Sequence, residues 1–373
     1  MNKKRDLAII GGMRFKDINA CTHRMIGIAK LFKPHCENVF LLGVGDQKEN
    51  GIFDSFDYET TKYPSGSFAF FKFTFSAREY IKFLKSKKSL KYVVVNGSVP
   101  SIPTIKIARY CRKNDIKFIF DIGEWYSNSY HFIKGLIKGL DVKIKMKTIC
   151  KKYNDYIVAS TYLADHCGRE KNVLILPTIV TSYLPNKSKS EKVYSGVINL
   201  SFIGMLEKRN LKEDLHPLIE AIAGFNNNHQ TKFVLNVIGT DGDDQTYVKY
   251  FGRKKYTECI NYLIDSDFSL IPRSKTRKNE SGFPTKLSES FAYGVPVIAT
   301  DTSDIKKYII DGENGYLLSF NTKQCFYECF QTIESELKKD NNFLNYLSSS
   351  TKANNRLVIN KFKENFKNFF SNI

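Results

Sequence analysis

A loop rich in glycine and proline, followed by a lysine and a glutamate, is the part of this sequence best suited to chemistry. Residues 280–298 read ESGFPTKLSESFAYGVPVI, which predicts a loop, a helix ending at Gly294 and a buried strand. Gly282 lets the backbone approach a ligand closely, and Thr285 is expected to cap the helix. The first amides of that helix suit a diphosphate, and Glu289, one turn on, could accept hydrogen bonds from ribose hydroxyls. An ordinary strand-to-helix loop explains the same pattern equally well.

The elements that must position this segment alternate between short apolar strands and helices. The run 92–96 is β-branched and unbroken, as in a strand buried on both faces. Such alternation predicts parallel, doubly wound α/β sheets, which bind ligands at the carboxyl ends of their strands. The expected strands lie at 7–10, 39–43, 92–96, 118–121, 156–160, 173–177, 197–204, 233–239, 268–272 and 295–300, with helices at 21–32, 102–114 and 217–225.

A polar stretch at 185–192 divides the alternation into two series and is read as a linker. We therefore predict two Rossmann-like domains, 1–185 and 193–350, that face a central crevice. The remaining segment, 351–373, is expected to end in a helix with Phe362, Phe366 and Phe370 on one face.

Positive charge is concentrated in the first half of the chain. The formal net charge is +19; residues 1–190 hold 33 Lys and Arg against 16 Asp and Glu, whereas residues 191–373 hold 24 against 22. The first half is therefore expected to meet an anionic partner, either nucleic acid or a membrane. Residues 131–152 interleave seven lysines with apolar side chains. That segment either packs on its own sheet or docks on an anionic bilayer, and the charge excess favours the bilayer.

The stretch from 267 to 318 closely resembles the donor-binding region of the GT-B, family-4-like glycosyltransferases that make bacterial capsule, exopolysaccharide and O-antigen chains. The matching text is DFSLIPR at 267–273, GFPTKLSES at 282–290, GVPVI at 294–298 and DGENGYL at 311–317. More loosely, the resemblance covers the whole chain. It implies the GT-B fold, an acceptor-binding first domain, a donor-binding second domain, and a last helix that crosses back to the first domain.

The resemblance also implies roles in the second domain. Glu289 matches the second glutamate of the family's E-x7-E pattern, which holds the nucleotide ribose, whereas the first position is Ser281 and Glu280 lies one residue earlier. Sugar contacts would then come from the backbone near Gly282, Phe283 and Pro284. The residues expected to hold the diphosphate or to line its site are Lys286, Arg273, Thr285 and Gly204, with Lys208 or Arg209 in place of the arginine that often follows this glycine. A solvated charged loop is the other interpretation of Lys208 and Arg209.

In the first domain, the glycine loop Gly11–Gly12 and the residues after the strand at 118–121 are expected on the acceptor side. Many family members have a histidine near here; this chain has Asp121 and Glu124, and His131 further on. A carboxylate could orient or deprotonate the acceptor hydroxyl, although Glu124 fits equally well as a helix cap. Arg24 is a candidate to reach the diphosphate or the acceptor.

The resemblance implies transfer with retention of anomeric configuration and without a bound metal. Asp265 and Asp267 have the D-x-D spacing of manganese sites in the other main glycosyltransferase fold, but Asp267 directly precedes a buried strand. We therefore expect no metal and no cofactor, with a nucleotide sugar, by default a UDP-sugar, as substrate.

No apolar run approaches the roughly 18–20 residues that span a bilayer, and the run at 7–10 is too short for a signal peptide. We expect a cytoplasmic protein, peripheral on the inner face of the plasma membrane. Its partners would be the donor, a lipid-linked or glycan acceptor and the anionic surface, met by Lys138, Lys143, Lys145 and Lys147, and not nucleic acid. Alternatives are a nucleotide-sugar epimerase on the same fold and a non-catalytic scaffold partner in a polysaccharide assembly complex. The absent first glutamate favours the scaffold, whereas Lys286 and Glu289 favour an enzyme.

Overall fold

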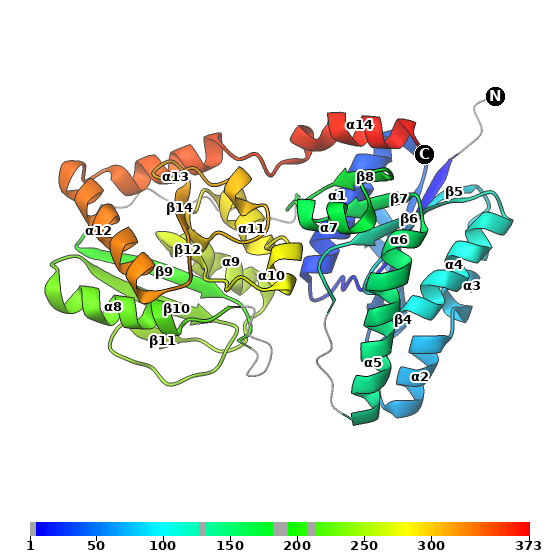
Figure 1. Cartoon of the computed structure of the whole chain (residues 1–373), viewed down its shortest axis with the longest axis horizontal. Coiled ribbons are helices and arrows are strands. Elements are labelled where there is room, and N and C mark those ends of the chain that lie inside the picture. Colours follow the sequence, from blue (N-terminus) through cyan, green and yellow to red (C-terminus); the bar gives the residue numbers. More distant parts are fainter. Residues whose placement is uncertain (1–4, 127–131, 182–192, 207–212) are drawn as a thin grey trace. The chain divides into compact units, whose positions relative to one another are not determined.

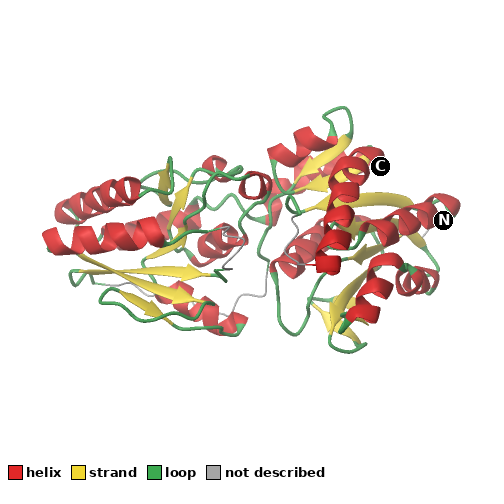
Figure 2. Cartoon of the chain, turned by 60° about the horizontal axis from the view of Figure 1, so that its bottom comes forward, coloured by secondary structure: helices red, strands yellow, loops and turns green. Residues whose placement is uncertain are grey.

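The chain is divided into two compact α/β units. A computed structural model describes residues 5–126, 132–181, 193–206 and 213–373. Unit 1 comprises Met1–Tyr183 and Val358–Ile373, and unit 2 comprises Leu184–Leu357. In each unit the strands form one layer with helices against it, as Figures 1 and 2 show. The predicted fold class, two Rossmann-like α/β domains, is confirmed. The predicted linker lies outside the described residues.

Unit 1 is built on an eight-stranded sheet in the order β3-β4-β2-β1-β5-β6-β7-β8. Its paired strands are parallel except for the hairpin of β3 and β4. The strand order reverses between β1 and β5, so these two strands flank the switch point where open α/β sheets bind ligands. The strands are β1 Asp6–Ile10, β2 Val39–Gly45, β3 Asn50–Phe53, β4 Phe56–Lys62, β5 Leu90–Asn96, β6 Lys117–Ile122, β7 Asp155–Val158 and β8 Asn172–Ile175.

The last segment of the chain belongs to unit 1. Phe362 ends a 3₁₀ turn, Ile359–Phe362, and the α-helix proper starts one residue later. The rings of Phe366 and Phe370 pack edge-on against Phe32 of α1, with centroids 4.8 and 5.7 Å away. The helices of the unit are α1 Ala20–Phe32, α2 Ser67–Phe75, α3 Arg78–Lys85, α4 Ser101–Lys113, α5 Phe132–Ile144, α6 Cys150–Lys152, α7 Thr161–Cys167 and α14 Lys363–Ser371.

Unit 2 has a six-stranded parallel sheet in the order β11-β10-β9-β12-β13-β14. Counted from its own first strand this is the order 3-2-1-4-5-6 of the dinucleotide-binding fold, with the switch point between β9 and β12. Asp267 joins these two strands, because its carboxylate accepts from the Asn199 amide at 2.8 Å. The strands are β9 Val197–Ile203, β10 Lys232–Ile238, β11 Val248–Tyr250, β12 Phe268–Ile271, β13 Val297–Thr300 and β14 Gly315–Leu318.

An aromatic core joins the helices of unit 2 to one face of its sheet. Phe233 of β10 stacks on Phe330 of α12 with ring centroids 4.1 Å apart, and Phe225 of α8 meets both edge-on. All three rings are fully buried, so truncating any of them to alanine is expected to cost about 3–5 kcal/mol. The helices are α8 His216–Asn228, α9 Tyr256–Asp265, α10 Arg277–Ser281, α11 Thr285–Tyr293, α12 Lys323–Lys339 and α13 Phe343–Ala353.

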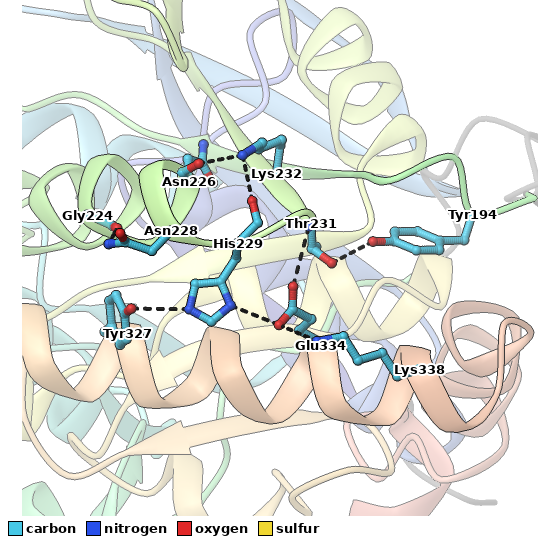
Figure 3. A network of polar contacts seen from close by, with 10 residues as sticks. All are labelled: Tyr194, Gly224, Asn226, Asn228, His229, Thr231, Lys232, Tyr327, Glu334 and Lys338. Carbon is cyan, nitrogen blue, oxygen red and sulfur yellow. Dashed lines mark hydrogen bonds and ion pairs between the residues drawn. The ribbon is translucent and has the colours of Figure 1, made fainter.

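A polar network centred on Glu334 ties α8 to α12 at the edge of this core (Figure 3). The buried carboxylate contacts His229 Nδ1 at 2.8 Å and Lys338 Nζ at 2.9 Å, and accepts from the Thr231 amide at 3.3 Å. His229 Nε2 lies 3.2 Å from the Tyr327 hydroxyl. Burial opposes ionisation of Glu334, but these hydrogen bonds outweigh it and lower its pKa to about 2.

Replacing Glu334 with Gln is expected to lower the free energy of unfolding by about 1.5–3 kcal/mol at pH 7, because the hydrogen bonds lose their charge. Since the folded-state pKa lies below the ordinary 4.5, the carboxylate adds stability above about pH 4.5 and loses it as the pH falls toward 2. Urea titrations of both proteins between pH 7 and pH 3 measure this. A difference that stayed constant over that range would contradict a role for the charge.

Candidate functional site

Two glycines form the floor of the candidate site in unit 2. Gly204 directly follows β9 and Gly239 follows β10, with φ at +102°. A Cβ atom on Gly204 would lie 2.9 Å from Lys286 Nζ, and one on Gly239 would lie 2.8 Å from the Gly204 carbonyl oxygen. Glycine at 204 thus leaves room for the Lys286 ammonium where it lies, and glycine at 239 allows the close approach of its backbone to Gly204.

A cluster of two cations and one carboxylate lies beside these glycines. Lys286 Nζ is 2.7 Å from one Glu213 oxygen, and Arg273 Nε is 3.5 Å from the other. The Lys286 ammonium also lies 4.0 Å from the centroid of the Phe202 ring. Burial lowers the pKa of Lys286, although the ion pair with Glu213 opposes that shift. The cluster thus holds more positive than negative charge in a largely desolvated place, which suits an anion.

Backbone pairing holds the cluster at the switch point of unit 2. Arg273 lies two residues beyond β12, and a β-bridge pairs it with Glu213. Thr300 at the end of β13 fixes the same turn, because its hydroxyl accepts from the Arg273 amide at 2.8 Å and donates to the Arg273 carbonyl at 2.6 Å. Cations from α11 and from the end of β12 therefore meet at the carboxyl edge of the sheet, where ligands bind in this fold.

The loop before α11 differs in one respect from the prediction. Pro284 occupies the N-cap position and Thr285 is the first helical residue, so Thr285 makes no side-chain cap. The expected cap is therefore wrong. Phe283 is buried against the ring of Tyr308, 5.4 Å between centroids, and this contact fixes the loop instead. The helix ends as predicted at Gly294, whose φ of +70° is left-handed.

Glu289 lies one turn after Lys286 on α11 and is half-buried. Burial raises the pKa of its carboxyl to about 7, and the Tyr256 hydroxyl and the Lys286 charge only partly offset this effect. A carboxyl that ionises near pH 7 is unusual, and such shifts gather at functional sites. A ligand that donates hydrogen bonds to this group favours its ionised form. Near pH 7, binding of such a ligand would therefore also release a proton from Glu289.

At the position of the absent first glutamate, Ser281 is buried and its hydroxyl donates to the Lys278 carbonyl at 3.1 Å. Glu280 lies half-buried in the same short helix, α10. Its role stays a prediction. Lys208 and Arg209 lie outside the described residues, as does His131.

Glu213 is the member of the cluster that sequence reasoning missed. It lies 60 residues from Arg273 and 73 from Lys286 in the chain. The charged residues that surround it in the sequence suggest a loop exposed to solvent. Glu213 stands beside Asp214 and among other charged residues, so its neighbours in the sequence give no sign of Arg273 and Lys286. Its only sequence clue is that it follows the glycine-terminated strand β9 within ten residues.

In unit 1 the predicted residues Arg24 and Asp121 bind each other. Arg24 Nε and Nη2 contact the Asp121 carboxylate at 2.9 and 2.6 Å, and Asn96 Nδ2 donates to the same carboxylate at 2.5 Å. Arg24 Nη1 donates to the Leu176 carbonyl at 2.6 Å. Asp121 is completely buried within β6 and Arg24 is 4% exposed. These side chains hold α1, β5, β6 and the residue after β8 together.

This pairing corrects two predictions. Asp121 was expected beyond its strand, as a base for the acceptor hydroxyl, and Arg24 at the diphosphate or the acceptor. Both are instead consumed by a buried ion pair, whose rupture would leave a charge uncompensated at a cost of about 3–5 kcal/mol. Glu124, in the loop after β6, is half-exposed and remains a candidate.

The glycine loop of unit 1 lies at that unit's switch point. The Gly12 amide donates to Ser98 Oγ at 2.7 Å, so the loop after β1 is fastened to the loop after β5. A Cβ on Gly11 would lie 3.0 Å from Asn96 Cβ, which keeps this position small. The acceptor-side role expected for Gly11 and Gly12 stays a prediction.

Comparison with known proteins identifies the region that carries the cluster. Residues 188–348 match the family described as glycosyl transferases group 1. This match covers less than half of the chain, and within it the chain is similar to group 1 glycosyltransferases. The matched segment includes Gly204, Glu213, Arg273, Lys286 and Glu289, that is, the whole of the site described in unit 2.

Two relatives and one solved structure are also similar to this chain. An uncharacterized 41.2 kDa protein in the cps region of Klebsiella pneumoniae is 23% identical over 265 residues, 66% of this chain and 64% of the relative. The amylovoran biosynthesis glycosyltransferase AmsK of Erwinia amylovora is 33% identical over 78 residues, 21% of this chain and 19% of the relative. The chain thus spans less than two thirds of these relatives. The Anabaena protein Alr3699/HepE, solved with UDP and glucose, superposes with a TM-score of 0.64 at 12% identity, over 99% of this chain and 100% of that one.

The predicted resemblance to glycosyltransferases is therefore confirmed as a similarity of residues 188–348, and the predicted GT-B fold is confirmed for the chain. Among the described residues, no group of three or more His, Cys, Asp and Glu side chains could hold a metal ion. None of the helices in the described ranges is long and apolar enough to cross a membrane.

Proposed function

We propose that this protein transfers a sugar from a nucleotide-sugar donor, by preference a UDP-sugar, to a lipid-linked glycan acceptor in bacterial surface polysaccharide synthesis. The observation that carries the proposal is the cluster of Lys286, Arg273 and Glu213 at the switch point of a group 1 glycosyltransferase domain. The cps and amylovoran contexts of its relatives support the polysaccharide, and the UDP and glucose bound by its structural relative support the donor.

In the proposed donor complex, the diphosphate lies against Lys286, Arg273 and the first amides of α11. The ribose hydroxyls donate to Glu289, and the sugar lies along Gly282, Phe283 and Pro284. During transfer the bond between the anomeric carbon and the diphosphate oxygen breaks, and the acceptor oxygen bonds to that carbon on the same face. The acceptor proton passes to the departing phosphate, and the two cations stabilise the negative charge that develops there.

Donor turnover tests this proposal. The purified protein is screened by thermal shift against a panel of nucleotide sugars, because a tight ligand raises the melting temperature by mass action. The best ligand is then incubated with enzyme and acceptor, and release of the nucleoside diphosphate is measured. A nucleotide sugar that binds but is neither transferred nor hydrolysed would favour the scaffold alternative.

Transfer is expected to survive chelation of divalent metals. The proposed cations at the diphosphate are side chains, so EDTA should change the rate of nucleotide release less than twofold. The same assay is run with EDTA and after adding manganese. Loss of activity in EDTA with recovery in manganese would overturn the metal-independent mechanism.

A further inference from the structure

The short helix α2 of unit 1 turns aromatic side chains toward the solvent. Phe68 is 85% exposed, Phe71 39% and Phe75 41%. Their spacing of three and four residues places them on one face, while Phe70, Phe73 and Thr74 point to the other side and are more buried. Isolated surface phenylalanines are common, but three on one helical face form a patch that marks a site of interaction.

The neighbouring helix α5 carries a second exposed apolar stripe. Leu136 is 67% exposed, Leu140 53% and Ile144 38%, each one turn from the next. Figure 1 shows α2 and α5 side by side at one end of unit 1. A cavity of about 270 Å³ lies between them, lined by Phe70 and Phe73 from α2 and by Lys138 and Asp141 from α5. We call the two apolar stripes together the α2–α5 face.

The exposed charged side chains of α2, of α5 and of the turn after α5 are all lysines. The one charged residue of α2 is Lys72, which is exposed. On α5 and the turn that follows it, Lys143 and Lys147 are exposed and continue the line of Leu136 and Leu140. The single acid between 132 and 152 is Asp141, which is buried and occupied by Lys145 at 3.4 Å and by the Ser101 amide at 2.6 Å.

Lys145, which we expected at the membrane, is excluded from this surface. Its side chain is 1% exposed, and its ammonium donates to the Gly97 carbonyl at 2.6 Å and lies 4.9 Å from the centroid of the Tyr126 ring. Burial lowers the pKa of this amine to about 8, partly opposed by Asp141. Lys145 therefore fastens the turn after α5 to the loop after β5, and the prediction of a membrane lysine at 145 is wrong.

We propose that the α2–α5 face is the membrane-docking surface, with the phenylalanines of α2 inserted at the headgroup level of an anionic bilayer and the lysines of α5 on its phosphates. This inference deepens the proposed function, since it assigns the membrane contact that a lipid-linked acceptor requires. Aromatic and aliphatic side chains flanked by lysines are the composition of helices that lie in a bilayer interface.

A second copy of the chain fits this face less well. In a two-fold dimer the same patch meets itself, so the positive charges of both copies, including Lys143 and Lys147, would be brought together without an exposed acid from α2 or α5 between them. Lysine is also depleted in the buried parts of protein interfaces. An anionic bilayer satisfies both the cations and the apolar side chains.

Vesicle sedimentation with matched variants tests the proposal. The probe is vesicles of equal parts phosphatidylglycerol and phosphatidylcholine, with pure phosphatidylcholine for comparison. Phe68→Gln with Phe71→Gln should weaken binding about tenfold at any salt concentration, because apolar burial is lost. Lys143→Gln with Lys147→Gln should weaken binding severalfold at low salt and flatten its salt dependence. The control, Lys85→Gln with Lys88→Gln, removes two exposed charges elsewhere in unit 1 and should bind as the parent does.

A tryptophan at position 68 reports insertion directly. Phe68→Trp should show a blue-shifted emission and quenching by brominated lipid on adding anionic vesicles, beyond the change of the parent with its single tryptophan. Phe320→Trp, an exposed site in unit 2, is the comparison. Equal weakening by the control lysine pair, or no quenching at 68, would overturn the proposal. So would a dimer in analytical ultracentrifugation that the phenylalanine variant dissociates.

These outcomes separate the docking surface from the proposed function. The variants in the α2–α5 face lie outside the unit that carries the donor cluster, so UDP-sugar binding in solution should stay within twofold of the parent. Vesicle binding without any nucleotide-sugar binding would refute the proposed donor and leave the docking surface intact. Donor binding without vesicle binding would refute the docking surface alone.

Discussion

Replacing Lys286 with Met is expected to lower kcat for sugar transfer by about 10²–10³-fold. The ammonium is the proposed partner of the departing diphosphate, and loss of one such preorganised cation costs about that factor. The residue is positioned for this task by Gly204, Phe202 and Glu213 and not by a flexible surface. Steady-state release of the nucleoside diphosphate, at saturating donor, measures the effect.

The same substitution removes the nearer of the two cations described beside Glu213, so it should also reduce stability. Adding Glu213→Gln removes the charge that Lys286 balanced and should restore the melting temperature without restoring kcat. Glu213→Gln alone keeps the ammonium and should retain most of the activity. If stability and activity recovered together in the double variant, Lys286 would be a structural residue and not a partner of the diphosphate.

Replacing Glu289 with Gln is expected to weaken UDP-sugar binding at pH 8 by about 1.5–3 kcal/mol, the contribution of hydrogen bonds to a charged acceptor. The effect should depend on pH, since the carboxyl ionises near pH 7 in the folded protein. At pH 6 only a minor fraction is ionised, so the parent should bind about tenfold more weakly than at pH 8. The Gln variant should show little pH dependence, and the two proteins should converge toward pH 6.

Isothermal titration with a UDP-sugar, whose diphosphate does not titrate in this range, measures both affinities and the proton released on binding. The folded-state pKa of Glu289 lies above the ordinary 4.5, so the free energy of unfolding falls as the pH rises from about 4.5 to 7. The Gln variant escapes this loss and should be at least as stable as the parent at pH 8. Equal affinity of the two proteins at pH 8 would remove Glu289 from the site.

Periodic and local features of this chain could be predicted from its sequence. Ten of the fourteen described strands lie within about two residues of the predicted apolar runs, because buried parallel strands need continuous hydrophobic segments. The strands β3, β4, β11 and β14 were not predicted. The end of α11 could be predicted from Gly294 alone, because glycine readily adopts the left-handed φ found at this position. The placement of Lys286, Arg273 and Gly204 followed from the resemblance to a family.

Features that depend on distant partners could not be predicted. From the sequence alone, Asp121 fits the role of a general base. The ion pair that excludes this role is made with Arg24, which lies 97 residues earlier in the chain. Lys145 reads as one lysine among seven, and only the fold turns its helical position inward toward Gly97. The Thr285 cap failed because Pro284 takes the cap position itself. The run of phenylalanines in α2 would suit a helix buried in a core. The exposure of Phe68, Phe71 and Phe75 is visible only in the structure, where the opposite side of the helix is the more buried one.

The return of residues 358–373 to unit 1 has a consequence for how the protein is made. Phe366 and Phe370 cover Phe32, so the first domain to leave the ribosome still exposes part of its core while the second domain is synthesised. Unit 2, by contrast, is one uninterrupted stretch and can finish folding first, although it is translated later. Unit 2 can therefore complete its core before unit 1 does, because the aromatic residues that cover Phe32 follow unit 2 in the chain.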